Sequence, residues 1–151
     1  MVRRVGDEAG CVVSINFFVA GEPLGEPRTR ARGMMIGGKA RARVYRDTGA
    51  DAWKQAVARA ASDFVPKEPI DVPVGVTLGF VMPRPKSRKK DVWHTAKPDA
   101  DNLAKAVLDV LTKCGVWVDD SRVSFLHATK SYECASNPRV GCWVSIRELG
   151  S

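Results

Sequence analysis

The sequence predicts an α+β fold in which two main helices pack against a small mixed β-sheet. Three observations predict it: several runs alternate apolar and polar residues, two segments carry apolar residues at helical spacing, and the strands are grouped beside the helices without strict alternation. The 151 residues suit one globular domain. We expect residues 1–10 to be a flexible N-terminus and residues 11–151 to form a single domain.

The first expected strand covers residues 13–19, where Val13, Ile15, Phe17 and Val19 alternate with other side chains. A basic segment follows at residues 27–46, with seven Lys and Arg side chains, no acid and a central Gly-Gly pair. Either an extended hairpin with one basic face or a mobile basic loop fits this pattern.

The first expected helix begins at a capping box formed by Thr48 and Asp51, and it stops before Pro66. Residues 74–82 alternate again and end at proline, which predicts a half-buried strand. A second basic cluster at residues 84–90 follows this strand.

The second expected helix covers residues 99–113 and ends at Gly115, which suits a left-handed C-cap. Two more alternating runs follow, at about residues 122–132 and 139–147. The Ser136-Asn137-Pro138 sequence between them favours a turn, so we expect these two strands to form an antiparallel pair. Two helices cannot cover both faces of such a sheet, and some apolar surface is therefore expected between subunits.

The composition favours a polyanionic partner. The chain has 24 Lys and Arg against 17 Asp and Glu, a net charge of +7. No window resembles the apolar run of about 18 residues that a membrane span needs, so we expect a cytoplasmic protein without a membrane partner. Its cysteines contain no C-x-x-C pair and are interpreted as reduced thiols rather than a zinc site: Cys11, Cys114, Cys134 and Cys142.

Four aspartates gather at the two ends of the second expected helix: Asp99, Asp101, Asp119 and Asp120. Each has a structural alternative, because the first pair can stabilise a helix N-terminus and the second can form a polar turn. If the chain runs back along the helix after Gly115, however, the pairs meet. Carboxylates in close contact stay ionised when a cation neutralises them, and Mg²⁺ suits oxygen ligands.

Such a metal site acts on phosphates. The metal polarises a phosphoryl oxygen, helps to deprotonate a water molecule and stabilises the leaving oxygen. Lys105, one helical turn after Asp101, is placed to neutralise charge in the transition state, or else forms an exposed ion pair with that aspartate. The pattern does not decide between one metal ion and two.

The segment KPDADNLAKAVLDVLTKCGVWVDD, continued by SRVSFLHATKSY, closely resembles the signature of the RusA-like Holliday-junction resolvases. The match covers Lys97 to Tyr132 and includes K-P-D-x-D-N, the lysine, G-V-W and the paired aspartates. The resemblance implies a homodimer, intertwined or closely packed, that cuts two opposed strands of a four-way DNA junction with Mg²⁺ or Mn²⁺. It implies metal binding by Asp99, Asp101 and Asp120, with Asp119 as a supporting acid and Lys105 as the catalytic lysine.

The basic segments then become candidate contacts for DNA phosphates: Arg28, Arg30, Arg32, Lys39, Arg41, Arg43, Lys86, Arg88, Lys89 and Lys90. For any one of them a solvated surface is the alternative. Two other functions stay open, a DNA- or RNA-binding protein without enzymatic activity and a nuclease for other branched nucleic acids. No small-molecule cofactor is expected.

Overall fold

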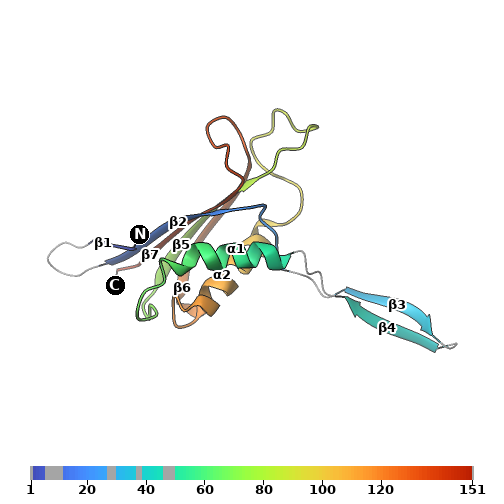
Figure 1. The fold of residues 1–151 in the computed structure, drawn as a ribbon, viewed down its shortest axis with the longest axis horizontal. Helices are drawn as coiled ribbons and strands as arrows, with labels where there is room; N and C mark the ends of the chain where they lie inside the picture. Colours follow the sequence, from blue (N-terminus) through green and yellow to red (C-terminus); the bar gives the residue numbers. More distant parts are fainter. Residues whose placement is uncertain (1, 6–11, 27–29, 37–38, 46–49, 151) are drawn as a thin grey trace.

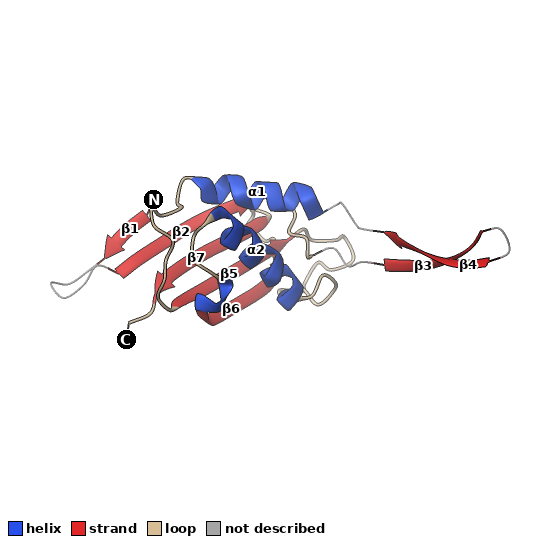
Figure 2. Ribbon diagram, turned by 90° about the horizontal axis from the view of Figure 1, so that it is seen from below, coloured by secondary structure: helices blue, strands red, loops and turns tan. Residues whose placement is uncertain are grey.

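The computed structural model describes residues 2–5, 12–26, 30–36, 39–45 and 50–150. Its main layer is a five-stranded sheet with the order β1-β2-β7-β5-β6. The two helices lie on one face of this sheet (Figures 1 and 2). The predicted α+β fold, a mixed sheet with two helices packed against it, is therefore confirmed. The strands are β1 (Val2–Val5), β2 (Val12–Ala20), β5 (Val74–Met82), β6 (Val123–Tyr132) and β7 (Gly141–Glu148), and the helices are α1 (Ala50–Ser62) and α2 (Ala100–Cys114).

The core lies between the sheet and the helices. Alternate residues of β5 face the helices, and its Val74, Val76, Leu78 and Phe80 are fully buried. From the helices, Trp53 and Leu103 enter the same cluster. The buried side chains of the strand, two residues apart, therefore pack against the buried side chains of α2, three or four residues apart. This shared interior is why the apolar pattern predicted both elements.

The end of α2 follows its sequence closely. Gly115 has φ 83° and ψ 26°, and its N–H donates to the carbonyls of Leu111 and Thr112. This confirms the predicted left-handed C-cap. Beyond it, the Trp117 indole is buried and donates to Thr112 Oγ1 at 2.7 Å. The chain that leaves α2 is therefore held close to the last turn of the helix.

The predicted antiparallel pair of C-terminal strands is wrong. β7 pairs with β2 and β5, whereas β6 pairs in parallel with β5 on its other side. The turn expected at residues 136–138 exists, with reciprocal backbone hydrogen bonds between Cys134 and Asn137, but it belongs to a longer connection. β5 lies between the two strands, and almost all of its residues are buried there.

The basic segment at residues 27–46 contains a hairpin, the first of the two alternatives that its sequence allowed, and not a basic loop. β3 (Arg30–Ile36) and β4 (Lys39–Tyr45) make a separate two-stranded sheet that extends away from the main layer (Figure 1). The register pairs Arg32 with Arg43 and Ile36 with Lys39. Arg28 and the Gly37–Gly38 pair lie outside the described residues.

The N-terminal segment contains a strand that the sequence pattern did not predict. Residues Val2–Val5 pair with Val12–Ile15 of β2 at one side of the sheet. Among the described residues, neither helix is long and apolar enough to cross a membrane.

Candidate active site

The first pair of aspartates lies at the N-terminal end of α2. Asp99 occupies the N-cap with extended backbone angles, φ −71° and ψ 150°, and its side chain makes no capping hydrogen bond. Asp101 is exposed in the first turn, and its Oδ1 accepts a hydrogen bond from the N–H of Asn102 at 2.9 Å. Acidic side chains are common in the first turn of a helix, where the backbone amides and the helix dipole attract negative charge.

Lys130 holds the segment that leads into Asp99. Its ammonium donates to the carbonyls of Ala96 and Pro98, at 2.8 Å each. The backbone of the same lysine accepts a hydrogen bond from the N–H of His94 at 3.2 Å. Strand β6 thus fixes this segment through both a side chain and its backbone. The sequence pattern placed Lys130 on this strand but did not reveal the contact.

Asn102 of the D-x-D-N motif connects α2 to the segment that precedes the β3–β4 hairpin. Its Nδ2 donates to the carbonyl of Glu26 at 3.4 Å. Gly25 lies so close to the Asn102 amide that a Cβ at this position would collide with it. The last described residues before the hairpin are therefore packed against the first turn of α2, beside the aspartates.

A second group of charged side chains includes Glu26 of this segment. Lys54 Nζ of α1 and Glu26 Oε2 form an ion pair at 2.7 Å, with each side chain less than one-fifth exposed. Burial would raise the pKa of Glu26, but hydrogen bonds to Lys54 and Asp109 and the lysine charges lower it overall. The pKa of Asp109 is raised by burial, by its hydrogen bond to Glu26 and by the Glu26 charge. Of the two acids, Asp109 therefore holds its proton more tightly, and the charge of Lys105 acts on both.

The second pair of aspartates lies just before β6. Asp119 caps a short 3₁₀ turn, η1 (Asp120–Arg122), by accepting a hydrogen bond from the N–H of Ser121 at 3.2 Å. The hydrogen bonds to Ser121 lower the pKa of Asp119. The structural role that the sequence allowed for Asp119 is therefore observed. Asp120 is exposed.

The two pairs do not meet within one chain. They lie at opposite ends of α2, a helix of 15 residues, and such a helix is about 22 Å long. Strand β6 gives the same answer, because Val123 follows η1 while Lys130 contacts the segment before Asp99, and these positions in a strand are about 23 Å apart.

Among the described residues, no three His, Cys, Asp or Glu side chains lie close enough to hold a metal ion. The condition under which the two pairs meet, a return of the chain along the helix after Gly115, is therefore not fulfilled within a single chain. The residues after Gly115 instead pair with Ile70, whose N–H and carbonyl bond to Val116 and Val118.

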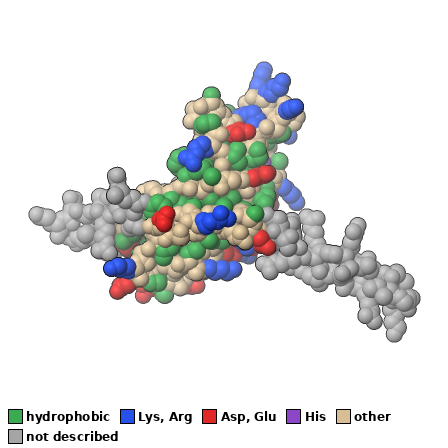
Figure 3. All heavy atoms as spheres, viewed as in Figure 1, with side chains coloured by type: hydrophobic (Ala, Val, Ile, Leu, Met, Phe, Trp, Pro, Cys, Tyr) green, Lys and Arg blue, Asp and Glu red, His purple; other side chains and the backbone are tan. Residues whose placement is uncertain are grey.

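The second basic cluster forms an exposed loop after β5. Lys86, Arg88, Lys89 and Lys90 are all exposed, and Figure 3 shows basic side chains gathered on this loop at the upper right of the molecule. Arg84 stabilises the loop, since its guanidinium donates to the carbonyls of Glu133 and Asp91 at 3.0 and 2.8 Å. The other predicted phosphate contacts on β3 and β4 have a described backbone only: Arg30, Arg32, Lys39, Arg41 and Arg43. Arg28 is outside the described residues.

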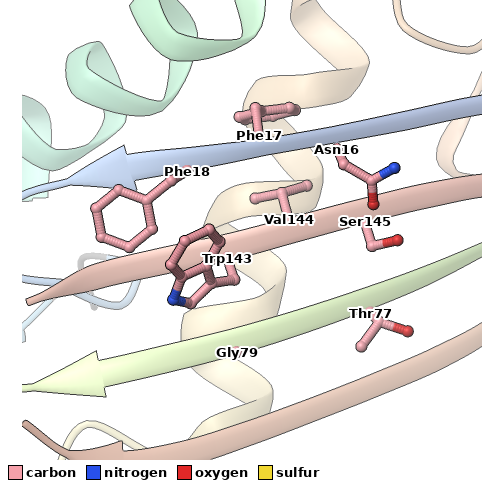
Figure 4. Close-up of a pocket in the computed structure, with 8 residues that line it drawn as sticks. All are labelled: Asn16, Phe17, Phe18, Thr77, Gly79, Trp143, Val144 and Ser145. Carbon is pink, nitrogen blue, oxygen red and sulfur yellow. The ribbon is translucent and has the colours of Figure 1, made fainter. Parts of the chain in front are cut away.

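A pocket of about 300 Å³ lies on the sheet and contains none of the predicted site residues. Figure 4 shows the residues that line it, which come from β2, β5 and β7. Here the Phe18 and Trp143 rings pack with centroids 4.6 Å apart, and the Arg139 guanidinium lies 4.0 Å from the Phe18 centroid.

Comparisons with known proteins agree with the motif around α2. Residues 20–145 match the family model described as "Endodeoxyribonuclease RusA". YqaN of Bacillus subtilis (strain 168), an uncharacterized protein, is 36% identical over 149 residues, covering 91% of this chain and 98% of YqaN. A crossover junction endodeoxyribonuclease rusA of Lactococcus phage r1t is 34% identical over 67 residues, covering 43% of this chain and 51% of the phage protein. The chain belongs to the RusA endodeoxyribonuclease family.

Proposed function

We propose that this protein is a Mg²⁺-dependent endodeoxyribonuclease that resolves four-way DNA junctions by cutting two opposed strands. Membership of the RusA family supports nuclease chemistry on DNA, and the phage relative is named for crossover junctions. The observation that carries the proposal is the placement of the motif carboxylates. Asp101 is exposed in the first turn of α2 and Asp120 is exposed in η1, beyond the other end of that helix, where nothing in the core requires a negative charge.

The residues fit a hard divalent cation. Asp99, Asp101, Asp119 and Asp120 supply only carboxylate oxygens, which suit Mg²⁺ and also Mn²⁺. When bound, the metal supplies a Lewis acid for the phosphoryl oxygen and lowers the pKa of a coordinated water. Asp119 is exposed and already has a capping role in η1, and this suits a supporting acid.

A complete site requires two subunits in this proposal. The pairs are about 20 Å apart in one chain, so Asp99 and Asp101 are joined by Asp120 of the partner subunit. A two-fold axis turns one such contact into two equal sites. Two equal sites match the two scissile phosphates of a four-way junction, which supports the proposed homodimer.

Lys105 is the proposed catalytic lysine. It is exposed on α2, one turn after Asp101, and its ammonium interacts electrostatically with Glu26 and Asp109. These acids attract the ammonium and restrict where the side chain extends. A positive charge beside the scissile phosphate stabilises the additional negative charge of the transition state. Replacement by alanine is expected to remove most turnover while changing junction affinity little.

DNA binding is assigned to the exposed basic loop at residues 84–90 and to the β3–β4 hairpin. The loop side chains Lys86, Lys89 and Lys90 are exposed, and Arg88 forms an ion pair with Asp91 at 3.1 Å. Contacts of this kind bind the DNA backbone without reading its sequence, and they weaken steeply as salt rises.

Mixing two inactive variants tests the shared site directly. Asp101→Asn and Asp120→Asn are each expected to bind a junction with normal affinity and to cut nothing in Mg²⁺. In a mixed dimer, one site receives both substitutions and the other receives neither. After subunit exchange at equal concentrations, about one quarter of the wild-type sites should be restored, seen as nicking of a labelled junction. If the mixture stays inactive although exchange is demonstrated, the shared site is excluded.

A substrate panel separates the remaining alternatives. The wild-type protein is incubated with a fixed four-way junction, a replication fork and a plain duplex, each with Mg²⁺ and with EDTA, and the cuts are mapped. Symmetrical cuts in the junction that need Mg²⁺ are expected. Binding in EDTA without cutting under any metal would support a DNA-binding protein instead, and cutting of the fork alone would support a different branched substrate.

A further inference from the structure

The main sheet has an open face on the side away from the two helices (Figures 1 and 2), and this face carries the pocket of Figure 4. At one end of the pocket, Trp143 pairs with Phe18 of β2 and with Gly79 of β5. Trp143 is 47% exposed, and its indole packs on one side against the Phe18 ring. On the other side Gly79 has no side chain, and a Cβ there would have only ordinary contacts, 3.7 Å from Trp143 Cβ and 3.9 Å from Thr129 Oγ1. The indole therefore borders an open space that suits a flat ring.

The other end of the pocket is a row of polar side chains, two residues further along the strands. Ser145 pairs with Asn16 of β2 and with Thr77 of β5, and Figure 4 shows the three side chains on neighbouring strands. Positions two residues apart in a strand are about 6.7 Å apart, so these hydroxyl and amide groups are within reach of the edge of a ring that stacks on Trp143. Unpaired nucleobases are recognised in this way, by stacking on a flat face and by hydrogen bonds along a polar edge.

Two exposed arginines lie at the two ends of the pocket. Arg139 precedes β7, and its guanidinium lies 4.0 Å from the Phe18 centroid. Arg147 lies on β7 beyond the polar row. A Cβ at Gly75 would lie 3.5 Å from both Arg147 Nε and Phe125 Cδ1, so this arginine also lies beside an aromatic ring, that of the 46% exposed Phe125. Positive charge and aromatic surface therefore occur together at both ends.

The charge of this face favours a polyanion. The five strands of the main sheet contain one acid, Glu148, and it pairs with Val74, which is buried on the side of the helices. The arginines of the open face are therefore not neutralised by carboxylates of the strands. Flat rings joined by phosphates are the chemistry of a nucleic-acid strand, and stacking on a protein ring requires bases that are not paired in a duplex. Membership of an endodeoxyribonuclease family indicates DNA.

We infer that the open face of the sheet binds single-stranded DNA, with one unpaired base stacked on Trp143 in the pocket and phosphates of the strand at Arg139 and Arg147. The site goes beyond the proposed nuclease function. It lies on the face opposite α2, whose N-terminal end carries Asp99 and Asp101, and it requires no metal. It gives the protein a contact for the unpaired strand of a branched substrate, separate from the basic loop that binds phosphates of the duplex arms.

Binding in EDTA tests the site, because nothing is cut and the result does not depend on the proposed nuclease activity. The probes for fluorescence anisotropy are a labelled oligothymidine of about 10 nucleotides and a duplex of the same length. Trp143→Ala should raise the dissociation constant of the single strand by about 5- to 150-fold, the loss of one stacked base, and leave that of the duplex unchanged. Trp143→Phe keeps a ring and should keep most of the affinity.

The arginines are tested by the salt dependence of the same binding. Each phosphate contact to a single strand contributes about 0.7 to the slope of log K against log salt concentration. Arg139→Ala and Arg147→Ala should therefore each reduce this slope by about 0.7 for oligothymidine. An unchanged slope in both variants would show that the phosphates lie elsewhere, and the proposed path of the strand would be wrong.

Trp93→Ala is the matched control, because Trp93 is also an exposed tryptophan, at 62%, and lies outside the pocket beside the last residues of β6. It should bind both probes like the wild type. Gly79→Val fills the space beside the indole, so it should weaken single-strand binding without lowering Tm, since valine is favoured in strands. Circular dichroism checks that every variant folds.

The inference is overturned if Trp143→Ala and Gly79→Val keep the wild-type affinity for oligothymidine. It is also overturned if Trp93→Ala causes the loss instead, or if Trp143→Ala weakens duplex binding equally. A wild-type protein that binds single strands through Trp143 but cuts no junction in Mg²⁺ supports this site and rejects only the proposed function.

Discussion

Replacing Lys130 with methionine should destabilise the protein by removing the donor to the Ala96 and Pro98 carbonyls. The two hydrogen bonds are short, 2.8 Å each, and the Lys130 side chain is half-buried. Hydrogen bonds from a charged group contribute about 1.5–3 kcal/mol, and two from the same ammonium are not additive. We therefore expect a loss of about 2–3 kcal/mol, which corresponds to about 4–12 °C in Tm for a domain of this size.

Thermal unfolding followed by circular dichroism measures this loss, with Lys89→Met as the control because Lys89 is exposed in a loop. The same substitution should also reduce Mg²⁺-dependent cutting more than junction binding, because the segment it releases leads directly into Asp99. A Lys130→Met variant with the wild-type Tm and wild-type turnover would refute the reasoning, since the two hydrogen bonds would then contribute neither stability nor positioning.

Three further outcomes are expected. The raised pKa of Asp109 means that the folded state binds the proton of this side chain more tightly than the unfolded state does. The free energy of unfolding therefore falls as pH rises from the ordinary value of 3.8 through the raised pKa. Asp109→Asn keeps a donor to Glu26, so it should increase Tm at neutral pH and change Tm less at about pH 4. Burial raises the pKa of Cys142 to about 12, whereas hydrogen bonds with Ser136 lower the pKa of the exposed Cys134. When the native protein reacts with iodoacetamide, peptide mass spectra should therefore show Cys134 labelled first and Cys142 unmodified. Leu103→Ala should cost about 2–5 kcal/mol in urea unfolding, because the side chain is fully buried in the core and leaves a cavity; a change below about 1 kcal/mol would show that the core closes around the gap.

Periodicity predicted most of the fold because the protein has one clear interior. The alternation in residues 74–82 and the helical spacing around Leu103 both follow from burial on one side, and Gly115 marks the end of α2 as expected. Pairing between strands was harder to predict. The turn at Cys134–Asn137 suggested a hairpin, but the apolar β5 takes the place between β6 and β7. Which strands become neighbours depends on how much apolar surface the whole sheet buries, and the local sequence of one strand does not show this.

The candidate site was predicted as a set of residues but not as a geometry. The spacing of Asp99, Asp101 and Lys105 places them on one end of a helix, and that part follows from the helical repeat alone. The position of Asp120 depends on residues 116–118, which pair with Ile70, a partner far away in the sequence. The contacts of Lys130 and Glu26 also join distant segments, so their residue types alone could not reveal them.

The parallel pairing of β5 with β6 affects the order in which the protein folds. All of α2 lies between these two strands, so they can join only after a crossover of 40 residues, from Met82 to Val123, has closed. Such non-local pairing is slow compared with the formation of hairpins such as β3–β4. During synthesis, the buried β5 therefore remains without its two neighbours until β6 and β7 have been made, and a high yield of native protein is favoured by low temperature and low chain concentration.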